Sequence, residues 1–222
     1  MIESYTGTPG CGKTYHAVYE MWEVLKYGGT VITNIPLTLP KKGLFQRGEY
    51  DYNFWETMEI TPKRLIDYSE KRRKELGVER LREDCILLVI DEAQLLFNCR
   101  DWNARGRGEW VKFFQLHRKL GYHIVLVTQI NKMLDRQIQG LLEYETLHRK
   151  FSNFGIKGKL VTFAMFTSCA FACVRMWSVL RERIDCKVLR YSRRIARMYD
   201  TGQMFWLYFL CHFVIVKINE KN

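Results

Sequence analysis

The chain has 222 residues, of which 47% are hydrophobic and 27% are charged. This composition is that of an ordinary globular protein and excludes a wholly disordered or fibrous chain. The length suffices for one domain of roughly 150 to 200 residues with an appendage, and such a domain needs no disulfides to stabilise its core. We expect residues 1–150 to form the core domain, residues 151–201 a small basic extension that completes it, and residues 202–222 an apolar tail.

The net charge of +11 is concentrated near the C-terminus. Residues 149–222 contain 14 Lys and Arg against 4 Asp and Glu, whereas residues 1–148 contain 21 against 20. A basic surface of this kind suits nucleic acid phosphates or the anionic face of a membrane, although a solvated surface is the simpler alternative. The charge therefore indicates a class of partner and says nothing about the fold.

The cysteines and the N-terminus indicate the compartment. The seven cysteines include no Cys-x-x-Cys pair and no zinc-type Cys/His spacing, which favours a reducing cytoplasm. The first residues, Met1–Tyr5, lack the basic and apolar regions of a secretory signal, so we expect no cleaved leader.

The first third of the chain alternates between strand and helix patterns. Ile2–Thr6 is strand-like, residues 7–12 form a loop, and residues 13–27 place apolar side chains at helical spacing before Gly28 and Gly29. Thr30–Thr33 is β-branched and reads as a second strand. The turn-rich, aromatic segment 34–57 is expected to be a long excursion without an evident role.

The alternation continues through the middle of the chain. Thr61 and Pro62 are a typical helix start, and that helix should reach Leu76. The remaining elements are an apolar strand over 85–90, a helix over 109–120 and a strand over 124–128. Strands that alternate with helices at these intervals predict an α/β fold, a three-layer αβα sandwich around a mainly parallel sheet.

From Lys157 onward the alternation weakens and predicts no topology. The apolar stretch Leu160–Val174 contains Thr162, Thr167 and Ser168, so we expect strands there rather than a membrane helix.

A phosphate-binding motif lies between the first strand and the first helix. The segment Gly7-Thr8-Pro9-Gly10-Cys11-Gly12-Lys13-Thr14 fits G-x-x-x-x-G-K-[ST] at every fixed position. Glycines allow successive N–H groups to point into one concavity, and the following helix adds its free N-terminal donors. Lys13 would reach the β and γ phosphates and the Thr14 hydroxyl would ligate Mg²⁺, whereas a chance glycine-rich turn would not have this context. The motif predicts a P-loop nucleoside triphosphatase that binds Mg-ATP.

An acidic pair follows the apolar strand Ile86–Ile90. Asp91 is expected to hold Mg²⁺, and Glu92 to orient and deprotonate the attacking water. Alone, such a pair is more often a charged helix start. Beside a phosphate loop, it predicts hydrolysis of ATP rather than phosphoryl transfer to another substrate.

Two further catalytic candidates lie on or after the next strand. Gln129 ends the strand pattern and could sense the γ-phosphate, or it could be an ordinary surface glutamine. Hydrolysis in this class is often completed by an arginine, supplied by the same chain or by a neighbouring subunit. Arg136 is the first candidate and Arg100 the second.

In their order, these motifs resemble those of the zonula occludens toxin (Zot) proteins, the inner-membrane assembly ATPases of filamentous phages. The resemblance covers most of residues 1–201 and rests on the segments Gly7–Thr14, Asn34-Ile35-Pro36, Ile90-Asp91-Glu92-Ala93-Gln94 with Arg100 after it, Thr128-Gln129, and Tyr199-Asp200-Thr201. It implies an oligomeric ATPase at the cytoplasmic face of the host inner membrane. Such an ATPase drives extrusion of single-stranded phage DNA, with phage coat and membrane assembly proteins as partners.

Family members typically continue through a transmembrane helix, and this chain departs from that pattern. Its apolar run Met204–Val216 has 13 residues, whereas a spanning helix needs about 20. A buried core segment is one interpretation. The block Arg175–Arg197, with seven arginines and one lysine, favours the other, a tail that contacts the inner membrane from the cytoplasmic side.

Three functions therefore remain as hypotheses. The first is a phage-assembly ATPase, and the second is a soluble DNA-processing or packaging ATPase that holds DNA with its basic third. A nucleotide-binding regulator with little hydrolysis is the third, and the presence of both Asp91 and Glu92 speaks against it.

Overall fold

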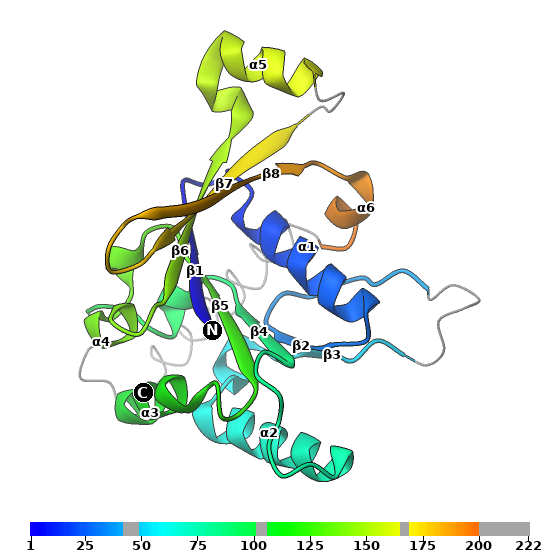
Figure 1. Cartoon of the computed structure of the whole chain (residues 1–222), viewed down its shortest axis with the longest axis vertical. Coiled ribbons are helices and arrows are strands. Elements are labelled where there is room, and N and C mark those ends of the chain that lie inside the picture. The colour runs from blue at the N-terminus through cyan, green and yellow to red at the C-terminus, as the bar shows by residue number, and fades with distance from the viewer. Residues whose placement is uncertain (42–48, 101–105, 165–168, 200–222) are drawn as a thin grey trace, which may run out of the picture.

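The computed structural model describes residues 1–41, 49–100, 106–164 and 169–199. Its centre is a sheet of eight strands (Figure 1). These are β1 (Ile2–Thr6), β2 (Thr30–Thr33), β3 (Tyr52–Phe54), β4 (Ile86–Ile90), β5 (Tyr122–Val127), β6 (Tyr144–Lys150), β7 (Ala170–Trp177) and β8 (Arg183–Arg190). Their order across the sheet is β3-β2-β4-β5-β1-β6-β7-β8. All pairs from β3 to β6 are parallel, and only the pairs β6–β7 and β7–β8 are antiparallel.

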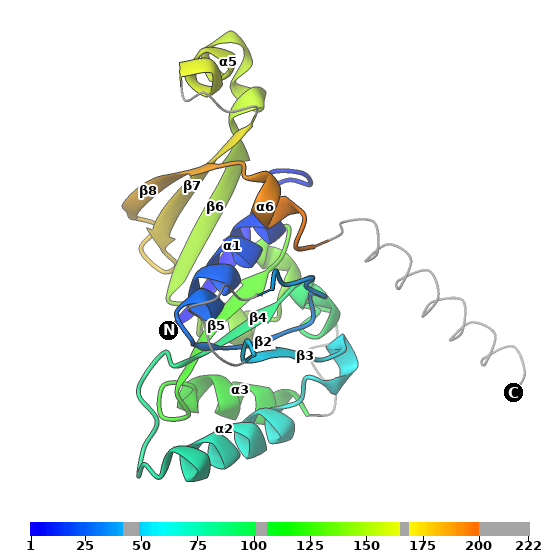
Figure 2. The same cartoon turned by 90° about the vertical axis from the view of Figure 1, so that its right-hand side faces the viewer.

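Helices cover both faces of the sheet and make three layers. They are α1 (Lys13–Lys26), α2 (Pro62–Leu76), α3 (Arg107–Leu116), α4 (Arg136–Gln139), α5 (Gly155–Ala164) and α6 (Arg193–Ala196). Short 3-10 turns lie at Thr57–Glu59, Ala93–Leu95, Asn131–Met133 and Phe151–Phe154. Figure 2 shows α1 and α6 on one side of the sheet and α2 and α3 on the other. The predicted three-layer α/β fold with a mainly parallel sheet is confirmed.

The central strands are buried on both faces because their residues are apolar without interruption. Along β4, Leu87 and Val89 pack in the cluster with α1, while Leu88 packs in the cluster with α2 and α3. Successive side chains of a strand point to opposite faces, so one apolar run supplies both cores. The continuous apolar pattern at 86–90 is therefore what places the following acidic pair at the end of a fully enclosed strand.

The predicted helix boundaries follow from local chemistry. The Thr61 side chain accepts a hydrogen bond from the Arg64 amide, Pro62 occupies the first turn, and Gly77 ends α2 in the left-handed conformation. The helix expected over 109–120 is shorter in the structure, because α3 ends at Leu116 and a turn carries the chain into β5.

The described part of the extension continues the main sheet. β6 is the last parallel strand, and β7 and β8 add to its edge beyond residue 150. The basic block Arg175–Arg197 spans the end of β7, all of β8 and α6. The proposed boundaries at 150 and 201 stay a prediction, and the tail 202–222, with its apolar run Met204–Val216, lies outside the described residues.

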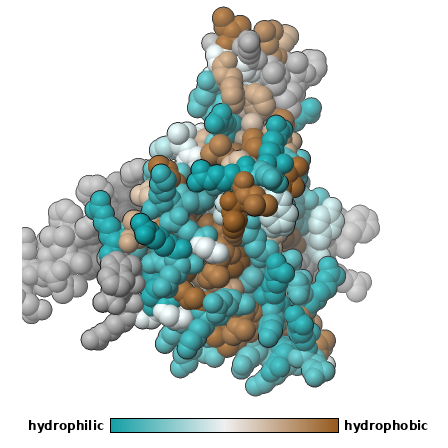
Figure 3. Space-filling view, turned by 60° about the vertical axis from the view of Figure 1, so that its left-hand side comes forward, coloured by the Kyte–Doolittle hydropathy of each residue, from teal (hydrophilic) through white to brown (hydrophobic). Residues whose placement is uncertain are grey.

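Between β6 and β7 the chain leaves the sheet and forms a projecting tip with α5. The expectation of strands throughout Leu160–Val174 is wrong in its first part, because residues up to Ala164 belong to α5 and β7 starts at Ala170. Ile156, Leu160 and Phe163 on α5 are 79%, 63% and 79% exposed. Figure 3 shows apolar residues at this tip and a further apolar patch on the body, which is otherwise mostly hydrophilic on this face. Within the described ranges, no helix combines the length and the apolar character needed to cross a bilayer.

Candidate active site

The phosphate loop joins β1 to α1, and its glycines are required by its backbone. Gly7, Gly10 and Gly12 have φ angles of 138°, 74° and 92°, a region that other residues rarely adopt. A Cβ atom on Gly7 would lie 2.6 Å from the His148 carbonyl oxygen, and one on Gly12 would lie 2.6 Å from the Phe171 ring. The loop therefore closes against β6 and β7 as well as against its own helix.

The N-terminus of α1 and Lys13 make the loop positive. Gly12 caps α1 without a side-chain hydrogen bond, so the first-turn N–H groups remain available for an anion. The Lys13 Nζ atom donates to the carbonyl oxygens of Gly7 and Thr8 at 2.9 and 3.2 Å. Binding a triphosphate there requires the ammonium group to exchange these carbonyls for phosphate oxygens.

The loop and the acidic pair meet although 77 positions separate their contacting residues. The Thr14 hydroxyl donates to Oδ2 of Asp91 at 3.0 Å. Asp91 is 3% exposed, and the half-buried Glu92 follows in a left-handed conformation with φ 49°. A hydroxyl and a carboxylate oxygen side by side are ligands of the kind that Mg²⁺ prefers, so this donor set fits the ion.

Burial, together with the neighbouring Glu92 carboxylate, raises the pKa of Asp91 to about 6, although the Glu92 amide, the Thr14 hydroxyl and Lys13 oppose the shift. The Asp91 carboxylate is therefore held in a largely water-free position. A cation beside it would favour its charged form.

Asn34, at the end of β2, positions the acidic pair. Its Oδ1 accepts a hydrogen bond from the Asp91 amide at 2.7 Å, and its Nδ2 donates to the Asp91 carbonyl at 3.0 Å and to the Thr57 hydroxyl at 3.0 Å. In the sequence, Asn34 directly follows a predicted strand and belongs to one of the segments that carry the Zot resemblance, but no role was predicted for it. Its partner lies 57 positions away on the neighbouring strand, so the sequence order alone did not bring the two together.

The strand that leads to Gln129 lies between the strands of the phosphate loop and the acidic pair. β5 is hydrogen-bonded to β1 on one side and to β4 on the other. Beyond it, the Gly7 amide donates to the Gln129 carbonyl oxygen at 3.1 Å. The Gln129 side chain is exposed, and Gln94 is the residue that hydrogen-bonds the Glu92 carboxylate. Gln129 is therefore adjacent to the loop through its backbone.

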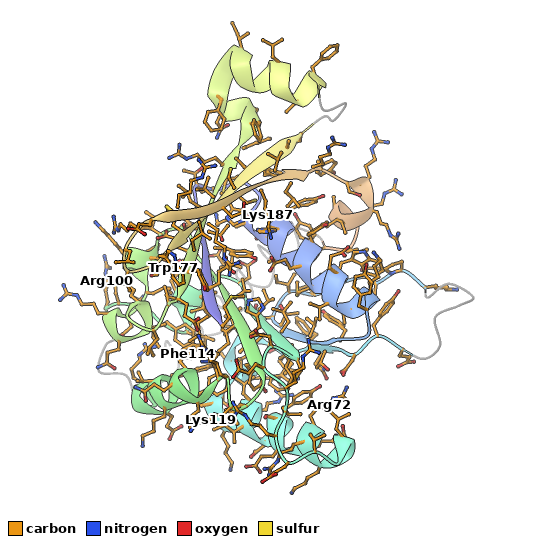
Figure 4. All side chains as sticks on the ribbon, in the orientation of Figure 1. Arg72, Arg100, Phe114, Lys119, Trp177 and Lys187 are labelled. Atoms are coloured by element: carbon orange, nitrogen blue, oxygen red, sulfur yellow. The ribbon has the colours of Figure 1, made fainter. Side chains whose placement is uncertain are left out.

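The two candidate arginines are exposed and lie on neighbouring segments. Asn98 pairs with Leu134 in an isolated antiparallel bridge, so Arg100 and Arg136 each follow this bridge by two residues. Figure 4 places Arg100 at the periphery, on the side of the molecule where α4 lies. Neither residue is part of the Thr14–Asp91 arrangement.

A family model described as "Zonular occludens toxin (Zot)" matches residues 1–204. The chain belongs to the Zot family. Two curated relatives, the Gene 1 proteins of Enterobacteria phage I2-2 and of Salmonella phage IKe, are each 30% identical to it over 156 residues. The match covers 68% of this chain and 40% of each relative, so it spans about two fifths of their length.

Solved structures share the fold of this Zot-family chain. The N-terminal domain of zonular occludens toxin from Neisseria meningitidis has a TM-score of 0.50 and 20% identity, with 90% of this chain and 98% of that chain covered. The genome packaging NTPase B204 from Sulfolobus turreted icosahedral virus 2, solved in complex with ATP-gammaS, has a TM-score of 0.52 and 14% identity, with 86% and 97% covered. At these identities the likeness concerns the fold alone, and that fold is the P-loop NTPase fold.

Proposed function

We propose that this Zot-family chain is a P-loop ATPase that hydrolyses Mg-ATP to drive the assembly and extrusion of a filamentous phage. The observation that carries the proposal is the contact between Thr14 on the phosphate loop and the buried Asp91, with Glu92 directly after it. Membership of a family whose curated relatives are phage Gene 1 proteins supports the phage part of the proposal.

The chain's own residues divide the work of hydrolysis. The N–H groups of the loop and of the first turn of α1 bind the phosphates, and Lys13 neutralises charge on the β and γ phosphates. Glu92 accepts a proton from a water molecule as the water oxygen bonds to the γ-phosphorus, and the bond to the β-phosphate oxygen breaks to release ADP. Gln94, which donates to the Glu92 carboxylate, orients this base.

Thr14 and Asp91 are the residues that would hold Mg²⁺. When bound, the ion neutralises negative charge on the phosphates and orients them for attack. Asn34 fixes the backbone of Asp91 from both its N–H and its carbonyl side. The Asp91 backbone is therefore held in place before any ligand arrives, and the Thr14 hydroxyl and the Glu92 amide donate hydrogen bonds to its carboxylate.

An arginine from a neighbouring subunit completes the site in this proposal. Arg136 and Arg100 are both exposed, so either acts most readily across an interface of a homo-oligomer. Arg136→Ala should then lower turnover of the assembled protein and spare ATP affinity. Unchanged turnover would transfer the role to Arg100.

Partners and location follow from the charge and from the family. We place the chain in the host cytoplasm at the inner membrane, where phage coat and membrane assembly proteins and single-stranded DNA are its partners. The exposed basic residues of β8 and α6, among them Arg183, Arg193 and Arg194, support contact with phosphates of DNA or lipid. Recovery of the expressed chain wholly in the soluble fraction at low salt would contradict membrane contact and favour the soluble DNA-packaging alternative.

Glu92→Gln tests the enzymatic proposal. The amide cannot accept the proton, so we expect ATP hydrolysis to fall roughly 10²- to 10⁴-fold while ATP still binds. Phosphate release and equilibrium binding of a fluorescent ATP analogue measure the two effects. Glu79→Gln, on an exposed surface segment, is the matched control and should change neither. Hydrolysis at the unmodified rate in Glu92→Gln would remove this residue from the mechanism.

The biological part is tested in the phage that encodes the chain. With Glu92→Gln, single-stranded phage DNA should accumulate inside the host while release of virions stops. Normal release would contradict the assembly function even if hydrolysis in vitro were lost.

A further inference from the structure

A second cluster of chemically reactive side chains lies behind the phosphate loop. His16 on α1, His148 on β6 and Cys173 on β7 bring their ligating atoms within 4.8 Å of one another. All three are buried, at 7%, 1% and 3% exposed. His148 and Cys173 are direct partners across the antiparallel β6–β7 pair, so their side chains share a face of the sheet, and α1 covers that face.

The outer nitrogen of each histidine faces an acceptor. Nε2 of His16 lies 3.5 Å from Oε1 of Glu20, one turn along α1, and Nδ1 of His148 lies 3.2 Å from the Thr6 carbonyl oxygen. A proton on each of these outer nitrogens would leave the two inner nitrogens free to bind a metal ion. This arrangement, a carboxylate or carbonyl behind each imidazole, is the one that orients histidines bound to metal ions.

The inner nitrogens of the two histidines lie close together. Nδ1 of His16 and Nε2 of His148 are 2.8 Å apart. In the tautomer that carries both protons on the outer nitrogens, each inner nitrogen presents a lone pair, and a metal ion beside the two nitrogens can accept both lone pairs.

We propose that His16, His148 and Cys173 bind a divalent transition-metal ion of the Zn²⁺ type between α1 and the β6–β7 pair. Two imidazole nitrogens and one thiolate are a ligand set typical of Zn²⁺, and a hard ion such as Mg²⁺ does not favour it. Tyr5 stacks on the His16 ring at 4.7 Å between centroids with 5° between planes, so that ring is held in place.

The surroundings leave room for a fourth ligand and contain charges of both signs. A cavity of about 30 Å³ adjoins His16 and Cys173, which is room for a water molecule. Carboxylates and cations both line it: Glu3, Glu20, Asp185, Arg175 and Lys187. In Figure 4, Lys187 points from β8 toward α1. The site would join the helix that follows the phosphate loop to the extension.

Cobalt titration of the full chain, treated with chelator and kept reduced, tests the proposal. We expect one Co²⁺ per chain, with the visible bands of tetrahedral cobalt and a thiolate-to-cobalt charge-transfer band, both abolished by Zn²⁺. Cobalt at Thr14 and Asp91 would have oxygen ligands only and no charge-transfer band. Zinc X-ray absorption of the unaltered chain should give about 2.0 Å for Zn–N and 2.3 Å for Zn–S.

Substitutions distinguish the metal ligands from the carboxylate that orients one of them. Cys173→Ser should remove the charge-transfer band, His148→Ala should lower Co²⁺ affinity at least tenfold, and Glu20→Gln should lower it about 10- to 100-fold. Cys99→Ser, at an exposed position, is the control and should keep both band and affinity. No charge-transfer band in the unaltered chain, or equal affinity in His148→Ala, would overturn the proposal. Either result would assign the cluster to a chain of hydrogen bonds running from a protonated Glu20.

Discussion

The two halves of the sheet differ in how deeply their strands are buried. Strands β2, β4, β5 and β1 are parallel, almost wholly buried and covered by helices on both faces, whereas β8 has mostly exposed residues and α5 projects from the body. The phosphate loop, Asp91 and Asn34 all belong to the first half. We call β2, β4, β5 and β1 the rigid half and the part with β8 and α5 the open half. The rigid half positions the catalytic residues, and the open half carries the basic and apolar surfaces.

Truncating a strand side chain should show the largest difference between the halves in the free energy of unfolding. Leu88 on β4 is fully buried, so Leu88→Ala should lower the free energy of unfolding by about 2 to 5 kcal/mol. Val188 on β8 is 44% exposed, and Val188→Ala is the matched control. It should lower the free energy of unfolding by well under half as much as Leu88→Ala. Urea denaturation measures both, and similar losses would mean that the two halves are equally packed.

Glu3, on β1 where the two halves of the sheet meet, should make the stability of the protein depend on pH. Burial raises the pKa of Glu3 on β1 to about 7, although Thr146 and Arg175 partly oppose it. The neutral form is thus favoured by folding. Its stabilising contribution is complete below the ordinary pKa of 4.5 and is lost as the pH rises through 7.

Glu3→Gln imitates the neutral form at every pH. Its stability relative to the unaltered chain should increase by up to about 3 kcal/mol between pH 4.5 and pH 7. Denaturation of chelator-treated protein across this range measures the difference. A difference that stays constant with pH would show that Glu3 ionises normally.

Asn34→Ala tests how the rigid half positions the chemistry. Losing both backbone contacts to Asp91 should lower the free energy of unfolding by about 1 to 3 kcal/mol and reduce hydrolysis roughly tenfold, more than it weakens ATP binding. Asn53→Ala, on the edge strand β3, removes side-chain hydrogen bonds away from the site and should leave hydrolysis unchanged. Equal effects of the two variants on hydrolysis would deny Asn34 a positioning role.

The smallest effect is expected at the tip. Leu160→Ser removes an exposed side chain of α5, so the free energy of unfolding should change by less than about 0.5 kcal/mol. Thermal denaturation measures this. A loss of several kcal/mol would show that α5 packs on another part of the protein.

The rigid half could be predicted from the sequence because its helices, strands and loop are determined by neighbouring residues. The uninterrupted apolar run at 86–90, the Thr61–Pro62 start of α2 and the glycines of the phosphate loop each determine nearby backbone. The open half could not be predicted in this way. Because α5 does not pack on the core, its apolar residues do not follow a helical period. Their mixing with threonines therefore indicated strands.

Contacts between distant residues were also beyond the sequence. Asn34 meets Asp91 because β2 and β4 are neighbours in the sheet, and His16 meets His148 because α1 packs on the sheet at β6. The absence of zinc-type spacing is compatible with a metal-binding cluster when its members come from three different elements. What the sequence gives reliably is the residue types of a site, and what the topology adds is their neighbours.

The link between the phosphate loop and β5 is made by main-chain atoms alone. Because the Gly7 amide and the Gln129 carbonyl are both backbone groups, substituting the Gln129 side chain leaves this contact formally present. Alanine at residue 7 does not test it either, because the added Cβ would itself disturb the loop. Replacing the residue 7 amide by an ester through semisynthesis would delete this donor without changing any side chain.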